Sequence, residues 1–135
     1  MIEHRELRSI CHASIGINNL AKAKAFYTPI LKILAIELVS EYEHAAAYGK
    51  GYPEFWLQRP FNQSPANSGN GVHFGFVALS RQQVDEFYQM ALSLGGQCNG
   101  APGARPDYGE PYYGCFIKDL EGNNIEASYW HVEEK

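Results

Sequence analysis

The sequence is short of cysteine, of clustered basic residues and of long hydrophobic runs. Its three cysteines, Cys11, Cys98 and Cys115, form no Cys-x-x-Cys pair, which argues against a disulfide framework or a zinc finger and favours a reducing compartment. Lysine and arginine number 11 against 15 acidic residues and are scattered, so no nucleic-acid partner is expected. Because no signal-like or membrane-spanning run occurs, we expect a cytoplasmic protein without a membrane partner.

Length and composition are those of one globular domain. The chain has 135 residues, of which 45% are hydrophobic and 19% charged. These values are typical of a soluble protein that buries an ordinary core. We therefore expect a single domain over residues 1–135.

A repeat divides the chain into two similar halves. His12 opens one apolar segment and His73 opens another, 61 residues later, and each is followed after 14 residues by a Phe-Tyr pair, Phe26-Tyr27 or Phe87-Tyr88. Two such units in register indicate a duplicated strand-then-helix element. A pseudo-twofold axis between the two units would direct both histidines to one point. Because imidazole is a common metal ligand, that point is a candidate metal site. The alternative is that two strand histidines align by chance.

The order of predicted elements indicates an α+β fold built from two βαβββ modules. We expect their strands to form a curled mixed sheet with the helices on its outer face. The first module covers residues 7–60 and the second 71–131, joined by a linker from Pro60 to Gly71. Pro29 is expected to kink the first helix or to tighten its last turn. The expected strands are 8–17, 36–42, 44–49, 54–59, 71–79, 97–101, 112–118 and 124–130, the helices are 20–34 and 81–94, and 102–111 is a loop.

Both histidines have small neighbours on their own face of the strand. Because strand side chains alternate, Ser14 shares a face with His12, and Gly75 shares one with His73. The bulky residues of both strands would face the helices. An imidazole beside a gap is typical of a ligand cavity.

Glu126 supplies a carboxylate within an otherwise apolar final strand. Burying it is costly unless a cation or a donor meets it; the alternative is an outward-facing Glu on an edge strand. His12, His73 and Glu126 together make a 2-His-1-carboxylate set that binds a divalent metal on one side. The set does not choose among Fe, Mn, Ni, Co and Zn. Glu126 would also be a catalytic residue.

A loop rich in charged and phenolic residues precedes the strand next to Glu126. Arg105 is expected to bind an anionic group of a substrate, with Tyr108 and Tyr112 also binding it. Tyr113 is expected to act as a catalytic acid. The alternative is a solvated loop with aromatic packing.

Three segments resemble the vicinal oxygen chelate superfamily: 12–27, 71–74 and 112–126, which ends in Asp-Leu-Glu-Gly-Asn-Asn-Ile-Glu. This superfamily includes glyoxalase I, extradiol dioxygenases, fosfomycin-resistance transferases and bleomycin-resistance proteins. The resemblance covers nearly the whole chain, and the Asp-x-x-Gly-Asn-x-Ile-Glu segment is its most specific part. It implies paired βαβββ modules around a metal, with His12, His73 and Glu126 at the ligand positions.

The sequence departs from the glyoxalase I pattern at one position. Those enzymes use a fourth ligand, a Glu on the last strand of the first module, where alignment with residues 125–127 puts Trp56. Indole cannot bind a metal, and Gln58, two residues on, could be only a weak oxygen ligand. We therefore expect three protein ligands and an open position, with Trp56 and Gln58 on the substrate side.

Together these features predict a small divalent-metal-dependent enzyme. Its substrate would chelate the metal through neighbouring oxygens, in lyase, isomerase or dioxygenase chemistry. The alternative is a metal-free small-molecule binding or drug-sequestering protein of the bleomycin-resistance type. We also expect a homodimer with a twofold axis, in which the path of the linker from Pro60 to Gly71 decides whether modules are exchanged between subunits.

Overall fold

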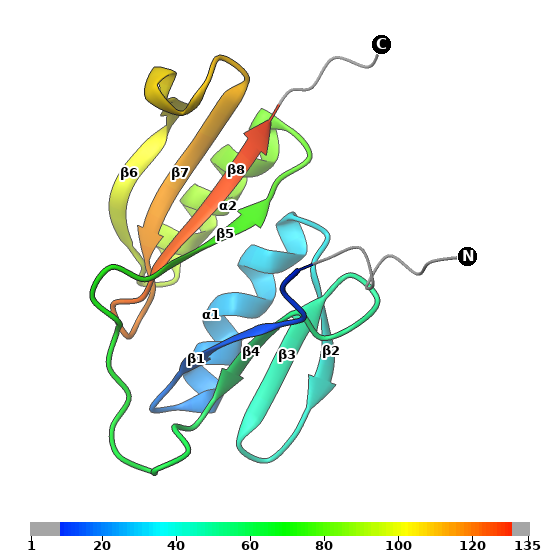
Figure 1. The fold of residues 1–135 in the computed structure, drawn as a ribbon, viewed down its shortest axis with the longest axis vertical. Helices are drawn as coiled ribbons and strands as arrows, with labels where there is room; N and C mark the ends of the chain where they lie inside the picture. The colour runs from blue at the N-terminus through cyan, green and yellow to red at the C-terminus, as the bar shows by residue number, and fades with distance from the viewer. Residues whose placement is uncertain (1–8, 131–135) are drawn as a thin grey trace.

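The computed structural model describes residues 9–130, which form two modules of the order βαβββ (Figure 1). The first contains β1 (Ala13–Gly16), α1 (Leu20–Ile33), β2 (Glu37–Glu41), β3 (Ala45–Gly49) and β4 (Phe55–Gln58). The second contains β5 (His73–Val77), α2 (Arg81–Ser93), β6 (Gln97–Ala104), a 3-10 turn (Pro106–Tyr108), β7 (Tyr112–Lys118) and β8 (Asn124–Trp130). The predicted α+β fold of two βαβββ modules is confirmed. The expected strand start at Arg8 and the module limits at residues 7 and 131 lie outside the described residues.

The strands form two four-stranded sheets with the same connectivity. Their orders are β1-β4-β3-β2 and β5-β8-β7-β6. In each module the first strand runs parallel to the last, and the other pairs are antiparallel. This identity of topology is what the sequence repeat predicts. It leaves β1 and β5 as equivalent edge strands.

Short polar residues and a glycine determine where the helices begin and end. The side chain of Asn19 accepts a hydrogen bond from Lys22 N at the start of α1, and Ser80 accepts one from Gln83 N at the start of α2. These N-caps satisfy backbone donors that would otherwise lack a partner. Gly95, with φ +102°, adopts the left-handed conformation that ends α2. No helix within residues 9–130 has the length and apolar character needed to cross a membrane.

The segment expected to be a loop over residues 102–111 contains more regular structure. Strand β6 continues to Ala104, and Pro106–Tyr108 forms a 3-10 turn. The β6–β7 pairing shifts register near Gly100 and Gly103. Glycine allows such irregularities, and Pro102 is tolerated because β6 lies at the edge of its sheet. Gly and Pro content alone therefore did not exclude a strand.

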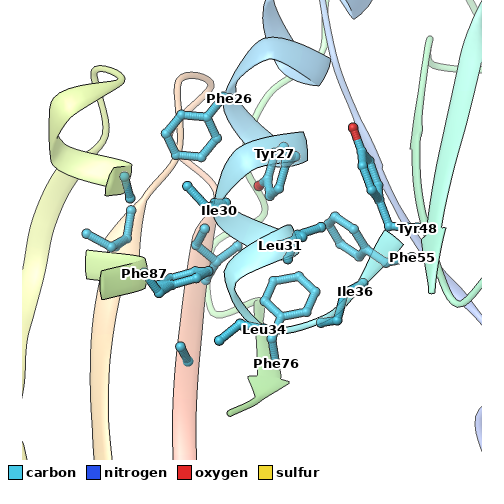
Figure 2. Close-up of a cluster of buried hydrophobic side chains, with 14 of the residues drawn as sticks. Phe26, Tyr27, Ile30, Leu31, Leu34, Ile36, Tyr48, Phe55, Phe76 and Phe87 are labelled. Carbon is cyan, nitrogen blue, oxygen red and sulfur yellow. The ribbon is translucent and has the colours of Figure 1, made fainter. Parts of the chain in front are cut away.

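One hydrophobic core joins the two modules (Figure 2). Phe26 and Ile30 of α1 and Phe87 of α2 all belong to this core. Phe55 of β4 packs against Phe76 of β5, with ring centroids 5.0 Å apart. The helices thus occupy the interior between the modules. This corrects the expectation of one curled mixed sheet with the helices on its outer face: the strands form two sheets, and the apolar stripes of both helices meet in the shared core. In one chain, the sheet faces that carry the polar candidate residues are turned away from this core.

A polar cluster also ties the second module to the first. The Tyr27 hydroxyl on α1 donates to the buried carboxylate of Asp119, in the turn between β7 and β8. Asn18 donates to both carboxylate oxygens of Glu121, at 2.9 Å and 2.7 Å, and accepts from Ala66 N in the linker at 2.7 Å. Burial, and then the Asp119 carboxylate, raise the pKa of Tyr27 well above its usual value.

Candidate metal centre

His73 and Glu126 come together on the outer face of the second sheet. Nε2 of His73 lies 3.2 Å from Oε1 of Glu126. His73 begins β5, and Gly75 pairs with Glu126 across β5 and β8. A Cβ added to Gly75 would lie 3.1 Å from Oε1, so the glycine leaves the space that the carboxylate uses. Only 12% of the Glu126 side chain is exposed, and a carboxylate in that position requires a donor or a cation.

Tyr112 supplies a donor to the other carboxylate oxygen. Its hydroxyl donates to Oε2 of Glu126 at 2.5 Å. The ring lies across Gly114, where a Cβ would be 2.2 Å from the hydroxyl oxygen. Burial raises the pKa of Tyr112 well above its usual value, and the hydrogen bond to Glu126 raises it further. Tyr112 therefore stays a neutral donor near neutral pH.

Tyr113 lies on the opposite face of the same strand. Its hydroxyl donates to Asp85 of α2 at 2.7 Å, and the Arg81 guanidinium lies over its ring at 5.1 Å. The structure thus does not bring Tyr113, the expected catalytic acid, to Glu126; the neighbouring Tyr112 is there instead. The pairing of Phe116 with Glu126 gives the reason, because even-numbered residues of β7 share the face of Glu126.

Arg105 and Tyr108 lie near the same face. The Arg105 guanidinium is 5.8 Å from the centre of the Phe116 ring, and Tyr108 meets the Tyr112 ring edge to face at 5.0 Å. Phe116 in turn lies 6.5 Å from the His73 ring, centroid to centroid. Of the predicted substrate-binding residues, Arg105, Tyr108 and Tyr112 therefore gather around Glu126. The sequence analysis did not predict that the Phe116 ring would lie between Arg105 and His73. Its position two residues after Gly114, and therefore on the same face of β7, was the signal that could have indicated this.

His12, Trp56 and Gln58 belong to the first module. With Ser14 they line a hollow of about 430 Å³ beside β1 and β4. Ser14 pairs with Trp56 across these strands, and the indole stacks on Tyr42 with centroids 6.1 Å apart. Nδ1 of His12 lies 3.4 Å from Sγ of Cys11.

A second cavity places His12 beside the second module. This space of about 480 Å³ is lined by His12 and also by Gly75 and Val77 of β5. Within residues 9–130 of one chain, however, no three His, Cys, Asp or Glu side chains are grouped to hold a metal ion. Convergence of His12 with His73 and Glu126, which was predicted for any combination of subunits, stays a prediction. The His73 nitrogen and the Glu126 oxygen are themselves donors suited to a divalent cation.

Comparison with known proteins identifies the family. The model of the Glyoxalase/Bleomycin resistance protein/Dioxygenase superfamily matches residues 9–127. The chain is 32% identical to a glyoxalase/bleomycin resistance protein from Albidiferax ferrireducens T118, whose crystal structure superposes with a TM-score of 0.81 over 87% of this chain and 96% of that one. A lactoylglutathione lyase from Agrobacterium tumefaciens shares the fold, with a TM-score of 0.61 and 22% identity over 87% of this chain and 90% of its own.

A curated relative is longer than this chain. Lactoylglutathione lyase of Arabidopsis thaliana is 25% identical over 127 residues, which are 90% of this chain but 44% of that protein. The chain thus spans less than half the length of this relative. The family model, the duplicated modules and the paired His73 and Glu126 agree, and the chain belongs to the Glyoxalase/Bleomycin resistance protein/Dioxygenase superfamily.

Proposed function

We propose that this protein is a small divalent-metal-dependent enzyme whose substrate chelates the metal through neighbouring oxygen atoms. The observation that carries the proposal is the pair formed by His73 and Glu126. An imidazole nitrogen 3.2 Å from a carboxylate oxygen of a mostly buried side chain supplies two of the three predicted donors. Two glycines, Gly75 and Gly114, leave the room that Glu126 and Tyr112 occupy.

The third ligand, in this proposal, is His12 of a second copy. His12 adjoins the sheet of the first module and Glu126 lies in the sheet of the second, and both sheets turn their polar faces away from the common core. A homodimer that apposes the first sheet of one chain with the second sheet of its partner would complete the set. A twofold axis would form two such sites.

A bound metal would act as a Lewis acid that polarises the chelating oxygens of the substrate. The chain's own residues would do the remaining work. Oε1 of Glu126, when it is not bound to the metal, would accept or return a proton, because Oε2 is engaged by Tyr112. Trp56 and Gln58, in the hollow beside His12, would bind the substrate from the other half of the site.

Lyase or isomerase chemistry is the favoured subclass. The support is the similarity to lactoylglutathione lyase of Arabidopsis thaliana. Trp56 lies where glyoxalase I is expected to have its fourth metal ligand, a glutamate. The proposed lyase or isomerase reaction is therefore not limited to lactoylglutathione as the substrate. Dioxygenase chemistry fits the same three ligands.

Elemental analysis of protein purified without an affinity tag tests the proposal. We expect about one divalent metal ion per chain, and loss of most of it in His73→Ala and Glu126→Gln. His44→Ala is the matched control, because His44 is an exposed histidine that lies beside Glu43. Protein that binds none of Fe, Mn, Ni, Co or Zn would contradict the proposal and favour a metal-free small-molecule binding protein.

A further inference from the structure

The Arg105 side chain is held by hydrogen bonds to backbone carbonyl groups of the adjoining edge strand, β6. Nη2 donates to the carbonyl oxygen of Ala101 at 2.7 Å, and Nη1 donates to that of Ala104 at 3.2 Å. A Cβ on Gly100 or Gly103 would lie 3.3 Å or 3.1 Å from these nitrogens. Because neither glycine has a side chain, the guanidinium can lie directly against the backbone of β6.

The charge of Arg105 has no acidic partner among residues 9–130. Its recorded hydrogen bonds go only to the two carbonyl groups, although a guanidinium has five N–H donors. It lies over the ring of Phe116, which pairs with Glu126 across β7 and β8. The unused donors are therefore available on the face that carries Glu126.

We propose that Arg105 forms an anion subsite, and that the substrate is a small organic acid carrying a carboxylate or phosphonate group. A planar guanidinium with free N–H groups recognises such oxyanions by paired, charge-assisted hydrogen bonds. The Phe116 and Tyr108 rings provide apolar surface beside it for the adjoining carbon skeleton. This inference rests on the proposed function only in taking the outer face of the second sheet as the substrate face.

Binding of simple anions to metal-free protein tests the subsite. Phenylacetate and phenylphosphonate are titrated into EDTA-treated, dialysed protein at constant ionic strength, with 2-phenylethanol as the neutral counterpart. We expect saturable binding of at least one anion and weaker binding of the alcohol. Arg105→Gln should weaken binding of that anion by roughly 10-fold or more. Which anion binds more tightly distinguishes a carboxylate substrate from a phosphonate substrate.

Two further variants separate recognition from folding. Arg81→Gln removes the same charge from a cation that also lies over a ring, Tyr113, on the opposite face of the sheet, and should leave anion binding unchanged. Gly103→Ala keeps the Arg105 charge but puts a methyl group against Nη1, and should weaken anion binding at an unchanged melting temperature. Should Arg105→Gln fail to fold, Gly103→Ala decides the question alone.

Three results would overturn the proposal: wild-type protein that binds neither anion, an Arg105→Gln variant that binds as wild type does, or equal weakening by Arg81→Gln. Because the titration is made without metal, its outcome is independent of metal content. If the protein as purified holds no metal, anion binding would still support this subsite, whereas the metal analysis would contradict the proposed function.

Discussion

The hydroxyl of Tyr112 lies 2.5 Å from Oε2 of Glu126, although the residue paired with Glu126 across β7 and β8 is Phe116. The tyrosine reaches the carboxylate by crossing Gly114, which has no side chain to block it. One carboxylate oxygen is thereby engaged, and the other, Oε1, remains beside His73. Glu126 therefore offers one oxygen, rather than two, to a ligand shared with His73.

Tyr112→Phe should change how the protein binds cobalt. The substitution removes the donor that holds Oε2, so the carboxylate is free to turn and to offer both oxygens. Loss of such an outer hydrogen bond typically weakens metal binding by about 10-fold to 100-fold. Calorimetry and the visible absorption of the cobalt-loaded protein measure the affinity and the coordination. Tyr113→Phe is the control, since it removes a hydroxyl bonded to Asp85 on the other face; similar spectra and affinities for both variants would refute this prediction.

Trp56→Glu should increase metal retention. Trp56 stacks on the exposed ring of Tyr42 and shares a hollow with His12, so a carboxylate there would add a fourth ligand to the proposed set. The free energy of unfolding should fall by about 1 kcal/mol, because the indole is only half-buried. Metal remaining after dialysis against EDTA is the measurement. Trp56→Gln is the uncharged control, and equal retention by both variants would show that position 56 does not face the metal.

Mixing two defective variants should restore metal binding if the site is shared between subunits. His12→Ala and Glu126→Gln should each bind little metal alone. Unfolded and refolded together in equal amounts, they should recover about a quarter of the wild-type metal content, because half of the dimers would be mixed and each would have one intact site. Light scattering should give a dimer mass for the wild type. A monomer mass at high micromolar concentration with metal present, or no recovery on mixing, would exclude a site shared in a homodimer.

Tyr27→Phe should lower stability and alter its dependence on alkaline pH. Loss of the hydroxyl leaves Asp119 with one donor fewer, at a cost of about 1–2 kcal/mol. Because the folded-state pKa of Tyr27 is raised, its contribution is complete below about pH 10 and is lost as the pH rises toward the folded-state value. Denaturant unfolding between neutral pH and pH 11 should therefore show a shallower alkaline decline in the variant. Tyr42→Phe, at an exposed ring, should follow the wild type; parallel curves for Tyr27→Phe would contradict the assigned role.

Local chemistry made much of this fold predictable. Asn19 and Ser80 cap the helices where polar residues precede an apolar stripe, and the repeat around His12 and His73 corresponds to two modules of identical topology. Pro29 lies inside α1, which nevertheless continues to Ile33. These features depend on residues close in sequence, which is why pattern and propensity suffice.

Features that depend on register and on pairing between modules were less accessible. Choosing Tyr112 over Tyr113 requires the alignment of β7 with β8, which the turn at Asp119 determines, and a slip of one residue reverses every side chain. The repeat also cannot state which two sheets face one another. The alternation of polar and apolar residues along a strand is the same whether the polar face packs against the same chain or against a partner chain.

The shared core and the cluster around Asp119 have a consequence for cooperativity. Neither half of the chain could keep Phe87 or Asp119 buried by itself, since Phe87 belongs to the core that α1 helps to form and Tyr27 of α1 donates to Asp119. Heat or denaturant should therefore melt both modules in one transition rather than in succession. A chain cut once between Pro60 and Gly71 should remain associated. A core substitution in α1, which belongs to the first module, would then also destabilise the position of Glu126 in the second module.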